Sequence, residues 1–488
     1  MKKISDILRG IKTLKIDGDT SLSISKIASD SRQIAPNSLF IAVRGTQVDG
    51  HDFIEKAVQN GAIAVICEAL PAHYQGEKNA RTTFIIVENA AAILGFVAAN
   101  FYDNPTEHLK VVGITGTNGK TSTATLLYDI FTNMGYKCGL ISTVEYRVSG
   151  RILPSTHTTP DPIALQNLFS MMNTEGVDFV FMEVSSHALQ QHRVAGIHFV
   201  GAVFSNITHD HLDYHKTFDN YLKAKKSLFD NLPKTAFALT NNDDKNGRVM
   251  LQNTKAAKNS YALKKIATFR AKIVENSLEG LHLDMDGQDF HARMIGEFNA
   301  YNLLAVYSTA VLLGADKTEL LTILSNLKGA EGRFDYIRNP HTNVVGIVDY
   351  AHTPDALEKV LETINQLRKK GQKIITLTGA GGDRDPVKRR YMGKIGAQLS
   401  DILILTSDNP RSEDPLSIIE QMKVDLNTKD ISKVIEIVDR RQAIKTAVKL
   451  AQNGDIILLA GKGHEKYQDI NGIKSPFDDK VELLQAFE

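Results

Sequence analysis

The chain has 488 residues, of which 42% are hydrophobic and 23% charged, a composition typical of a soluble globular protein too long for one hydrophobic core. The 57 Lys and Arg residues nearly balance the 56 Asp and Glu residues, so no global field attracts nucleic acid or an anionic membrane. Two cysteines, Cys67 and Cys138, lie far apart and fit a reducing compartment rather than a disulfide framework. No apolar run reaches about 18 residues. We therefore expect a cytoplasmic protein that binds neither nucleic acid nor membrane.

The first 107 residues predict a small α/β N-terminal domain. Apolar runs at 38–43, 62–67 and 83–87 predict short buried strands, and residues 53–59 predict a helix. Polar turns at 29–32 and 45–51 are candidates for ligand contact, although most turns of this composition are only turns. Asn104-Pro105-Thr106 predicts the boundary after this domain.

The next segment predicts a phosphate-binding loop. A β-branched run over 109–115 predicts a strand, and apolar residues at helical spacing before Gly135 predict a helix. Between them stand Gly116, Thr117, Asn118, Gly119, Lys120, Thr121 and Ser122. Backbone amides of such a loop surround phosphate, the lysine reaches the terminal phosphates, and the threonine hydroxyl binds Mg²⁺. Ile114 replaces the first glycine of the usual G-x-x-x-x-G-K-[ST] pattern.

Two further polar clusters follow predicted strands. Glu183-Val184-Ser185-Ser186-His187 follows the run 177–182, and a cluster rich in His and Asp at 205–215 follows the run 200–204. Ligands bind at the carboxyl ends of strands in open α/β sheets. The clusters therefore favour metal or phosphate chemistry. Residues 260–335 add short β-like runs and a helix. We therefore predict a central domain over residues 108–338, built on a parallel or mixed sheet like that of P-loop ATPases.

Residues 339–488 predict a C-terminal Rossmann-like domain. Strand-like runs at 343–349, 373–378, 401–406, 433–438 and 455–460 alternate with helical patterns, which indicates five parallel strands. Polar residues crowd most of the strand ends, so this domain should form one wall of a substrate cleft. The phosphate loop and the polar clusters predict that the protein binds ATP with Mg²⁺ and a second substrate. Three reaction classes fit this prediction: phosphoryl transfer to a hydroxyl, ATP hydrolysis coupled to a conformational switch, and activation of a carboxylate followed by attack of an amine.

Six motifs in order resemble those of the muramyl-peptide ligases of peptidoglycan synthesis, and the resemblance covers essentially the whole chain. They are residues 116–121, 183–187, 210–213, 296–299, 349–354 and 461–465. Within the family the chain is most similar to enzymes that add the third residue to UDP-N-acetylmuramoyl-L-alanyl-D-glutamate. The resemblance implies that ATP phosphorylates the D-glutamyl carboxylate and that an amino acid's amine attacks the acyl phosphate. Ile114 agrees with the family's G-T-N-G-K-T loop.

The resemblance also implies roles for individual residues. Lys120, Glu183, His211 and Lys225 would be catalytic, with Thr121, Glu183, His211 and Lys225, as a CO₂-derived carbamate, serving two Mg²⁺ ions. ATP would contact the loop 116–122 together with Asn299, Arg333 and Asp349. The UDP-muramyl dipeptide would contact Ser31, Thr46, Gln47, Val48, His157, Thr158, Thr159, Ser185, Gln191 and Arg193, with His157 standing where relatives often carry Asn. The first domain would then bind the uridine nucleotide.

The turn Asp408-Asn409-Pro410-Arg411 bears on which amino acid is added. Arginine presents a planar fork of donors suited to a carboxylate. meso-Diaminopimelate has a carboxylate at its far end, whereas lysine has only an ammonium there, and the turn resembles that of diaminopimelate-adding members. Arg389, Gly461 and Glu465 would complete this amino-acid site. The partners expected are thus small molecules, bound by a monomer.

Two enzymatic alternatives keep the same chemistry: addition of L-lysine, which the D-N-P-R turn disfavours, and a folylpolyglutamate-type ligase, which the large first domain disfavours. A non-catalytic ATP-binding switch protein is the alternative from another class. It would need only the phosphate loop, and it would leave Glu183, His211, Lys225 and Arg411 without a common explanation.

Overall fold

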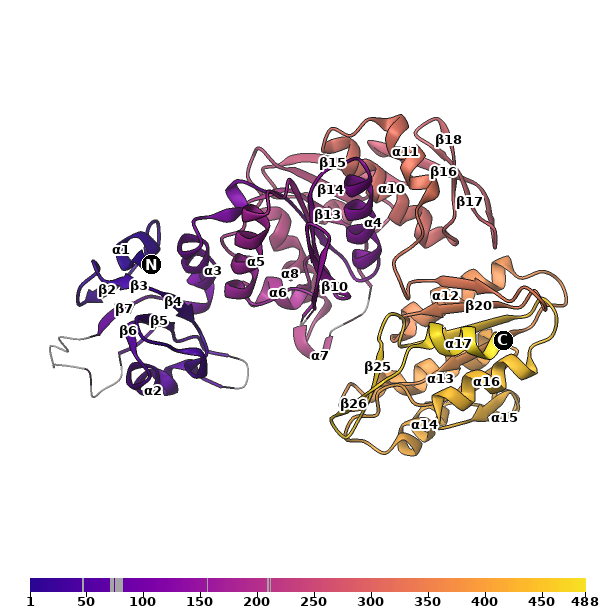
Figure 1. The fold of residues 1–488 in the computed structure, drawn as a ribbon. Helices are drawn as coiled ribbons and strands as arrows, with labels where there is room; N and C mark the ends of the chain where they lie inside the picture. Colours follow the sequence, from indigo (N-terminus) through magenta and orange to yellow (C-terminus); the bar gives the residue numbers. More distant parts are fainter. Residues whose placement is uncertain (46–47, 71–73, 75–81, 156, 209, 211) are drawn as a thin grey trace.

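The protein consists of three consecutive α/β parts, each built on its own main β-sheet, as Figure 1 shows. The computed structural model describes residues 1–45, 48–70, 74, 82–155, 157–208, 210 and 212–488. Figure 1 places the N-terminal and C-terminal sheets on opposite sides of the central sheet. The predicted fold class, with a mixed central sheet, is confirmed.

The N-terminal part is built on a five-stranded sheet of order β2-β7-β6-β5-β4, in which only β2 runs antiparallel to its neighbour. The strands are β2 Lys15–Asp17, β4 Lys26–Ala28, β5 Ser38–Ile41, β6 Ala62–Cys67 and β7 Thr83–Ile86, and β1 Lys2–Lys3 pairs with β3 Ser23–Ile24. The helices are α1 Ile4–Ile7, α2 Ile54–Gln59 and α3 Ala90–Phe101. The predicted strands and helix of this part are therefore present.

The central part has an eleven-stranded sheet of order β11-β10-β9-β12-β8-β13-β14-β15-β16-β17-β18. The strands are β8 Lys110–Thr115, β9 Cys138–Ile141, β10 Glu145–Val148, β11 Arg151–Pro154, β12 Phe179–Glu183, β13 Phe199–Phe204, β14 Phe237–Asn241, β15 Ala257–Ala262, β16 Phe269–Ser277, β17 Gly280–Met285 and β18 Gln288–Ala292. The strands β9-β12-β8-β13-β14-β15-β16, given in sheet order, pair in parallel. Antiparallel strands extend the sheet at both ends, β10 and β11 at one and β17 and β18 at the other.

Helices cover both faces of the central sheet. They are α4 Lys120–Asn133, α5 Pro162–Thr174, α6 Ser186–Gln190, α7 Leu212–His215, α8 Phe218–Asp230, α9 Gly247–Met250, α10 Glu297–Leu312 and α11 Lys317–Asn326. Successive residues of β8 face opposite cores: Val112 packs with side chains of α4 and α10, whereas Val111 packs with those of α5 and α8. Burial of both faces explains why the central strands are continuously apolar in sequence.

The C-terminal part has a six-stranded sheet of order β19-β20-β24-β21-β22-β23. The strands are β19 Asp335–Arg338, β20 Val345–Asp349, β21 Ile374–Thr378, β22 Ile402–Leu405, β23 Val434–Glu436 and β24 Ile456–Ala460. The five predicted strands are all present and pair in parallel. Sequence reasoning missed β19, which lies before residue 339 and pairs antiparallel with β20 at the sheet edge.

The helices of this part are α12 Pro354–Leu367, α13 Val387–Leu399, α14 Pro415–Lys423, α15 Thr428–Ile431, α16 Arg440–Leu450 and α17 Asp479–Phe487. A hairpin of β25 Tyr467–Ile470 and β26 Ile473–Pro476, also missed, follows β24. Both cysteines are free and buried. Across the described residues, every helix is too short or too polar to cross a membrane.

Candidate active site

The phosphate loop joins β8 to α4, and glycine is required at two of its positions. Gly116 has φ +156°, and a Cβ there would lie 1.9 Å from Ser205 Oγ. Gly119 has φ +87°, and a Cβ there would lie 2.4 Å from Asn302 Oδ1. The loop is also held from outside, because Asn206 Oδ1 accepts a hydrogen bond of 2.9 Å from the Asn118 amide. The amides of Thr117 and Asn118 both donate to Asn206, whereas the amides at the start of α4 have the geometry that binds phosphate.

Two lysines converge on the carbonyl oxygen of Gly116. Lys120 Nζ donates to it at 3.0 Å, and Lys225 Nζ, from α8, donates at 2.7 Å. Burial lowers the pKa of Lys120, whereas the charges of Glu183 and Asp210 raise it. Burial, and then the neighbouring Lys120 charge, hold the pKa of Lys225 well below its usual range. Lys225 is only 1% exposed, so it is not the solvated helix lysine that its sequence pattern alone would favour.

Glu183 ends β12 with a buried carboxylate. Its Oε1 accepts from the amide of Thr143 at 2.8 Å, and its Oε2 accepts from the Thr143 hydroxyl at 3.3 Å. Because its single proton goes to Glu183, the Thr143 hydroxyl accepts in turn from the Thr158 hydroxyl at 3.0 Å. Thr121, whose hydroxyl is the other metal-ligand candidate at the loop, is also buried. Fixed carboxylate and hydroxyl oxygens near the phosphate loop are suitable Mg²⁺ ligands.

A connected polar network extends from Glu183 along the central domain. Thr159 Oγ1 donates to the backbone carbonyl of Glu183 at 2.9 Å and accepts from the Ser185 amide at 3.1 Å. Arg193 donates to the carbonyl of Thr159 at 2.8 Å and, through two nitrogens, to Gln191 Oε1. The structure thus brings four of the expected substrate residues into one network beside the metal candidates.

Three further ATP candidates come from other parts of the chain. Arg333 lies with its guanidinium 4.5 Å from the Tyr350 ring and donates to Thr121 Oγ1 at 3.3 Å. Asp349 ends β20 and accepts from the Phe334 amide at 2.7 Å, and burial raises its pKa to about 6. Asn299 Oδ1 accepts from Asn302, the residue that lies against Gly119. Arg333 therefore links the phosphate loop to the C-terminal part.

The start of α12 also contacts the phosphate loop. Asp355 Oδ2 accepts from Asn118 Nδ2 at 3.2 Å and from the Thr208 hydroxyl at 3.1 Å. Nearby, burial lowers the pKa of His352 to about 4 and that of His464 to about 3, and both rings lie against Tyr350. These imidazoles are therefore neutral at physiological pH.

Arg411 is held in an unusual backbone conformation at the carboxyl edge of the C-terminal sheet. Its φ is +50°, its amide donates to the Asp469 carbonyl at 3.0 Å, and its own carbonyl accepts from Asn471 at 2.7 Å. Its side chain is half-buried and donates to the Gly382 carbonyl at 2.5 Å. The β25–β26 hairpin therefore fixes the turn that carries this guanidinium.

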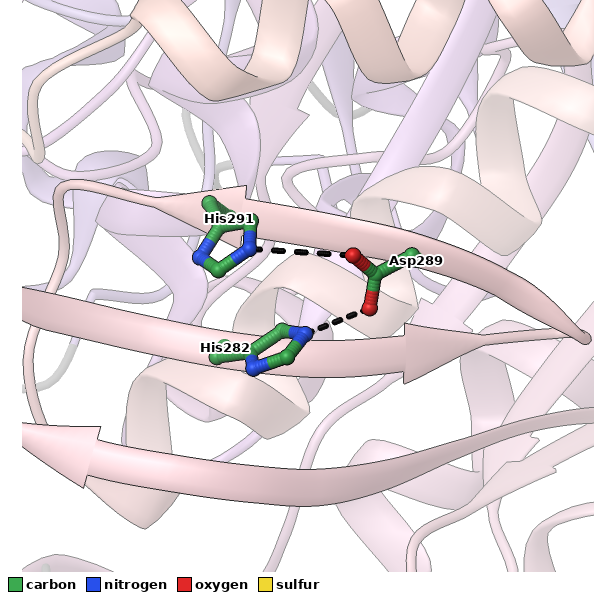
Figure 2. A group of neighbouring side chains, drawn as sticks. All are labelled: His282, Asp289 and His291. Carbon is green, nitrogen blue, oxygen red and sulfur yellow. Dashed lines mark hydrogen bonds and ion pairs between the residues drawn. The ribbon is translucent and has the colours of Figure 1, made fainter.

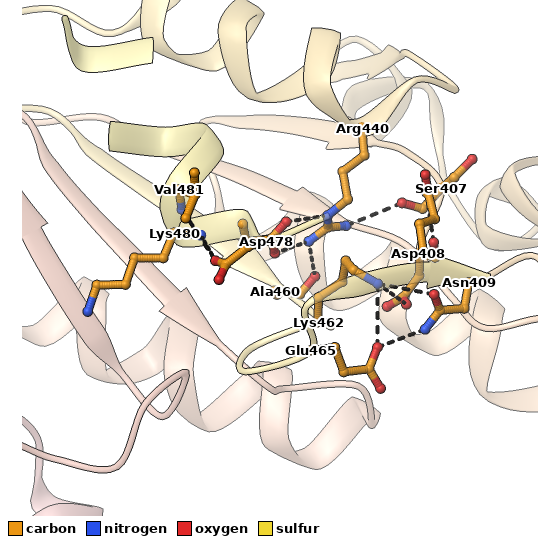
Figure 3. Close-up of polar contacts among 12 residues, drawn as sticks. Ser407, Asp408, Asn409, Arg440, Ala460, Lys462, Glu465, Asp478, Lys480 and Val481 are labelled. Carbon is orange, nitrogen blue, oxygen red and sulfur yellow. Dashed lines mark hydrogen bonds and ion pairs between the residues drawn. The ribbon is translucent and has the colours of Figure 1, made fainter. Parts of the chain in front are cut away.

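The adjacent residues form a buried charged network, shown in Figure 3. Lys462, fully buried, donates to Asn409 Oδ1 at 3.1 Å and to Glu465 Oε2 at 3.4 Å, and lies 4.0 Å from Asp408 Oδ1. Asn409 Nδ2 donates to the same Glu465 oxygen at 2.7 Å. This cluster leaves no room for a side chain at position 461, since a Cβ on Gly461 would lie 2.5 Å from Asp408 Oδ2. Burial raises the pKa of Glu465, and the Lys462 charge opposes that rise.

Arg389 lies beneath this edge with 1% of its surface exposed. It donates to both carboxylate oxygens of Glu413, at 2.7 and 2.8 Å, to Gln421 at 2.9 Å and to the Gly381 carbonyl at 3.1 Å. Its guanidinium therefore braces the loop beside Arg411. Direct contact between Arg389 and an amino acid stays a prediction.

The remaining candidates are scattered. Ser31 is buried in the N-terminal part and Val48 is 57% exposed there, while His157 is exposed at the end of the β10–β11 hairpin. Pro410 is buried within its turn. Thr46, Gln47 and His211 lie outside the described residues.

Several residues at the site were missed by sequence reasoning. Thr143, Asn302 and Asp355 hold the loop or Glu183, and only tertiary contacts identify them. Ser205, which donates to the Asn118 carbonyl, lies in the predicted polar cluster 205–215, but no role for it was predicted. Lys462 lies in the motif 461–465, but nothing in the sequence indicates that its ammonium group is buried.

Comparisons with known proteins agree on one family. Models described as Mur ligase family catalytic domain, Mur ligase middle domain and Mur ligase glutamate ligase domain match residues 23–102, 114–310 and 332–463. The UDP-N-acetylmuramoyl-L-alanyl-D-glutamate–2,6-diaminopimelate ligase of Cytophaga hutchinsonii is 52% identical, covering 100% of this chain and 99% of the relative. The enzyme of the same name from Parabacteroides distasonis is 49% identical over 99% of both chains.

Solved structures give the same picture. A structure of a UDP-N-acetylmuramoyl-L-alanyl-D-glutamate–2,6-diaminopimelate ligase aligns with a TM-score of 0.70 and 33% identity over 100% of this chain and 99% of that one. A MurF ligase from Thermotoga maritima in complex with ADP aligns with a TM-score of 0.60 over 95% of this chain and 96% of that one. Its identity of 19% supports the fold alone.

Proposed function

The chain belongs to the Mur ligase family, and on that basis we propose that it adds meso-2,6-diaminopimelate to UDP-N-acetylmuramoyl-L-alanyl-D-glutamate at the expense of ATP. The product would be a precursor of peptidoglycan. Full-length relatives at 49–52% identity carry this enzyme name. The other candidates, lysine addition and folate polyglutamylation, have no comparable support.

The observation that carries the proposal is the presence of opposite charges around one turn of the C-terminal site. Asn409 donates to Glu465 at 2.7 Å, and two residues further along the same turn the half-buried guanidinium of Arg411 donates to the Gly382 carbonyl. The distal end of meso-diaminopimelate bears one carboxylate and one ammonium. The guanidinium suits the first and the Glu465 carboxylate suits the second. Lysine lacks the distal carboxylate and would leave Arg411 without a carboxylate partner.

The reaction joins a carboxylate to an amine, which is unfavourable in water without activation. The D-glutamyl carboxylate oxygen attacks the γ-phosphorus of ATP, and ADP leaves. The amine of diaminopimelate then attacks the acyl phosphate carbon, a proton is lost, and phosphate leaves from the tetrahedral intermediate. Lys120, at the start of α4, would contact the transferred phosphoryl group, and the amides at the start of that helix would bind the phosphates.

We assign Mg²⁺ to Thr121 and Glu183, with His211 as a further ligand by resemblance. The donor set fits, since a hydroxyl and a fixed buried carboxylate are oxygen ligands. Bound Mg²⁺ would offset the negative charge of the phosphates. Arg333, which donates to the Thr121 hydroxyl, would exchange that contact for a nucleotide oxygen.

Lys225 fits this site only as a carbamate, because an ammonium would repel the metal. A neutral amine adds to the carbon of CO₂ and loses a proton to give an N-carboxylate. Burial and the neighbouring Lys120 charge favour the neutral amine that this reaction needs. The resulting anion would lie beside Lys120 and the phosphate loop.

We assign the remaining expected residues to the nucleotide sugar. Ser31, Val48, Thr46 and Gln47 in residues 1–107 would hold the uridine nucleotide. His157, Thr158, Thr159, Ser185, Gln191 and Arg193 would hold the muramyl dipeptide in the domain 108–338, and the domain 339–488 would hold the amino acid. We propose that the protein is cytoplasmic, because its substrates would be a UDP-activated sugar and ATP, and that it acts as a monomer.

The decisive experiment measures phosphate release from ATP with UDP-N-acetylmuramoyl-L-alanyl-D-glutamate, with and without meso-diaminopimelate or L-lysine. We expect release to depend on both substrates, to prefer meso-diaminopimelate, and to yield a tripeptide product by mass spectrometry. Phosphate release that does not depend on the amino acid would refute the proposed ligase activity. Preference for lysine would refute the role of Arg411.

A further inference from the structure

A histidine pair lies on the outer face of the β17–β18 hairpin, and Figure 2 shows it. His282 on β17 is directly opposite His291 on β18 in the antiparallel register. Asp289 precedes His291 by two residues and so shares its face. The alternate residues Leu281, Leu283, Phe290 and Ala292 are buried in the core. Strand alternation therefore directs two imidazoles and one carboxylate outward together.

The three side chains converge on a common point. His282 Nε2 contacts Asp289 Oδ1, and His291 Nε2 lies 3.7 Å from Asp289 Oδ2. The two rings stack with centroids 4.0 Å apart and planes inclined by 15°. One ligand atom from each residue lies within 4.8 Å of the others. Both imidazoles thus present the same nitrogen toward one carboxylate.

This donor set matches a transition metal rather than Mg²⁺ or Ca²⁺, which prefer oxygen ligands. A tetrahedral zinc ion about 2.0–2.1 Å from each donor holds its ligands about 3.4 Å apart. The exposed side chains of Asp289 and His291, at 74% and 70%, have room for the rotation that closes the remaining gap. Glu275 on β16 is opposite His282 in the register and adds a carboxylate on the same face.

We propose that His282, Asp289 and His291 bind one divalent transition-metal ion of the zinc class. The site is separate from the ligase site, because β17 and β18 are the last strands of the sheet order, whereas β8 and β12 carry the phosphate loop and Glu183. A bound ion would join the edge strand β18 to β17. Its effect would therefore be on the stability of this hairpin rather than on amide formation.

The test uses the full chain without a histidine tag, freed of metal by a chelator that is then removed. Titration calorimetry with ZnCl₂ is done in excess Mg²⁺, so that the phosphate-loop site is saturated. We expect one zinc ion per chain, and a melting temperature that rises with zinc concentration. His291→Ala and His282→Ala should each weaken zinc binding by about tenfold or more.

His108→Ala, which removes an exposed histidine elsewhere, is the matched control and should bind zinc as the wild type does. Asp289→Asn keeps the side-chain shape and should also weaken binding. The Co²⁺ form should lose its tetrahedral visible spectrum in the histidine variants. Absence of zinc binding in the wild type would overturn the proposal, as would unchanged affinity in both histidine variants.

Discussion

The phosphate loop and the Arg411 turn are both proposed to bind charged groups, but they are built differently. The loop is one contiguous stretch whose binding groups are backbone amides and a neighbouring lysine, with two glycines setting its shape. The turn depends on side chains and hairpin contacts from residues 381–389, 409–413, 462–465 and 469–471. A single substitution should therefore act on catalysis as a whole in the loop, and on one substrate in the turn.

The largest effect should come from Gly119→Ala. The added Cβ would clash with Asn302 Oδ1 at 2.4 Å and distort the start of α4, so we expect kcat to fall about a hundredfold or more with every acceptor. Gly135→Ala is the matched control, because Gly135 has nearly the same φ, +88°, with no atom within 4 Å. Equal loss of activity in both variants would show that backbone strain, not loop blockage, is responsible.

Lys225→Ala should reduce kcat by a similar factor, and short carboxylates such as formate or acetate should restore part of it by replacing the carbamate. Steady-state phosphate release measures both effects. Lys223→Ala, on the same helix but with a side chain that is 70% exposed, should keep wild-type activity. Full activity of Lys225→Ala without additives would exclude a carbamate.

Arg411→Ala should raise KM for meso-diaminopimelate about 10- to 100-fold, the loss expected for hydrogen bonds to a charged group, and leave KM for ATP nearly unchanged. The control Arg390→Ala removes an arginine on α13 whose side chain is 44% exposed. A parallel rise in both KM values would contradict a site specific for the amino acid.

Lys462→Met should raise KM for meso-diaminopimelate about tenfold, because the Asn409 carboxamide oxygen loses one of its two donors and keeps only the Asp469 amide. It should also raise the pKa of Glu465, so that KM worsens further as the pH is lowered. Lys474→Met alters an exposed lysine on β26 and serves as control. A variant with altered thermal stability but an unchanged KM and pH profile would limit Lys462 to a structural role.

Asp349→Asn should give the smallest effect, a change in how the unfolding free energy depends on pH. The pKa of Asp349 is raised to about 6, so the folded chain keeps a proton there that the unfolded chain loses near pH 4. Its contribution to the unfolding free energy therefore falls as pH rises from about 4 to 6, by at most about 3 kcal/mol. The melting temperature of the variant relative to wild type should rise across this window. A constant difference would refute the raised pKa.

Much of the architecture could be predicted from local pattern. The strand before the phosphate loop and most parallel strands of the C-terminal sheet are apolar runs with clear ends, and the helix after the loop has apolar residues at helical spacing. The short strand β19 and the β25–β26 hairpin were missed because exposed or half-buried residues such as Asp335 and Gln468 leave no continuous apolar run. At the site, contiguous motifs could be found, whereas Thr143 and Asp355 could not, since their partners are distant in sequence.

The sequence by itself determined the family, the phosphate loop and the chemical types present at each strand end, because these depend on order and spacing along the chain. Only the tertiary structure decided which of these side chains are buried, how they are oriented and which charges lie beside them. It buries Lys225 beside Lys120, turns Arg389 toward Glu413 rather than outward, and holds Asn409 between Lys462 and Glu465. The physical reason is that burial and the distances between charges depend on segments that the fold brings together, and these set protonation and orientation.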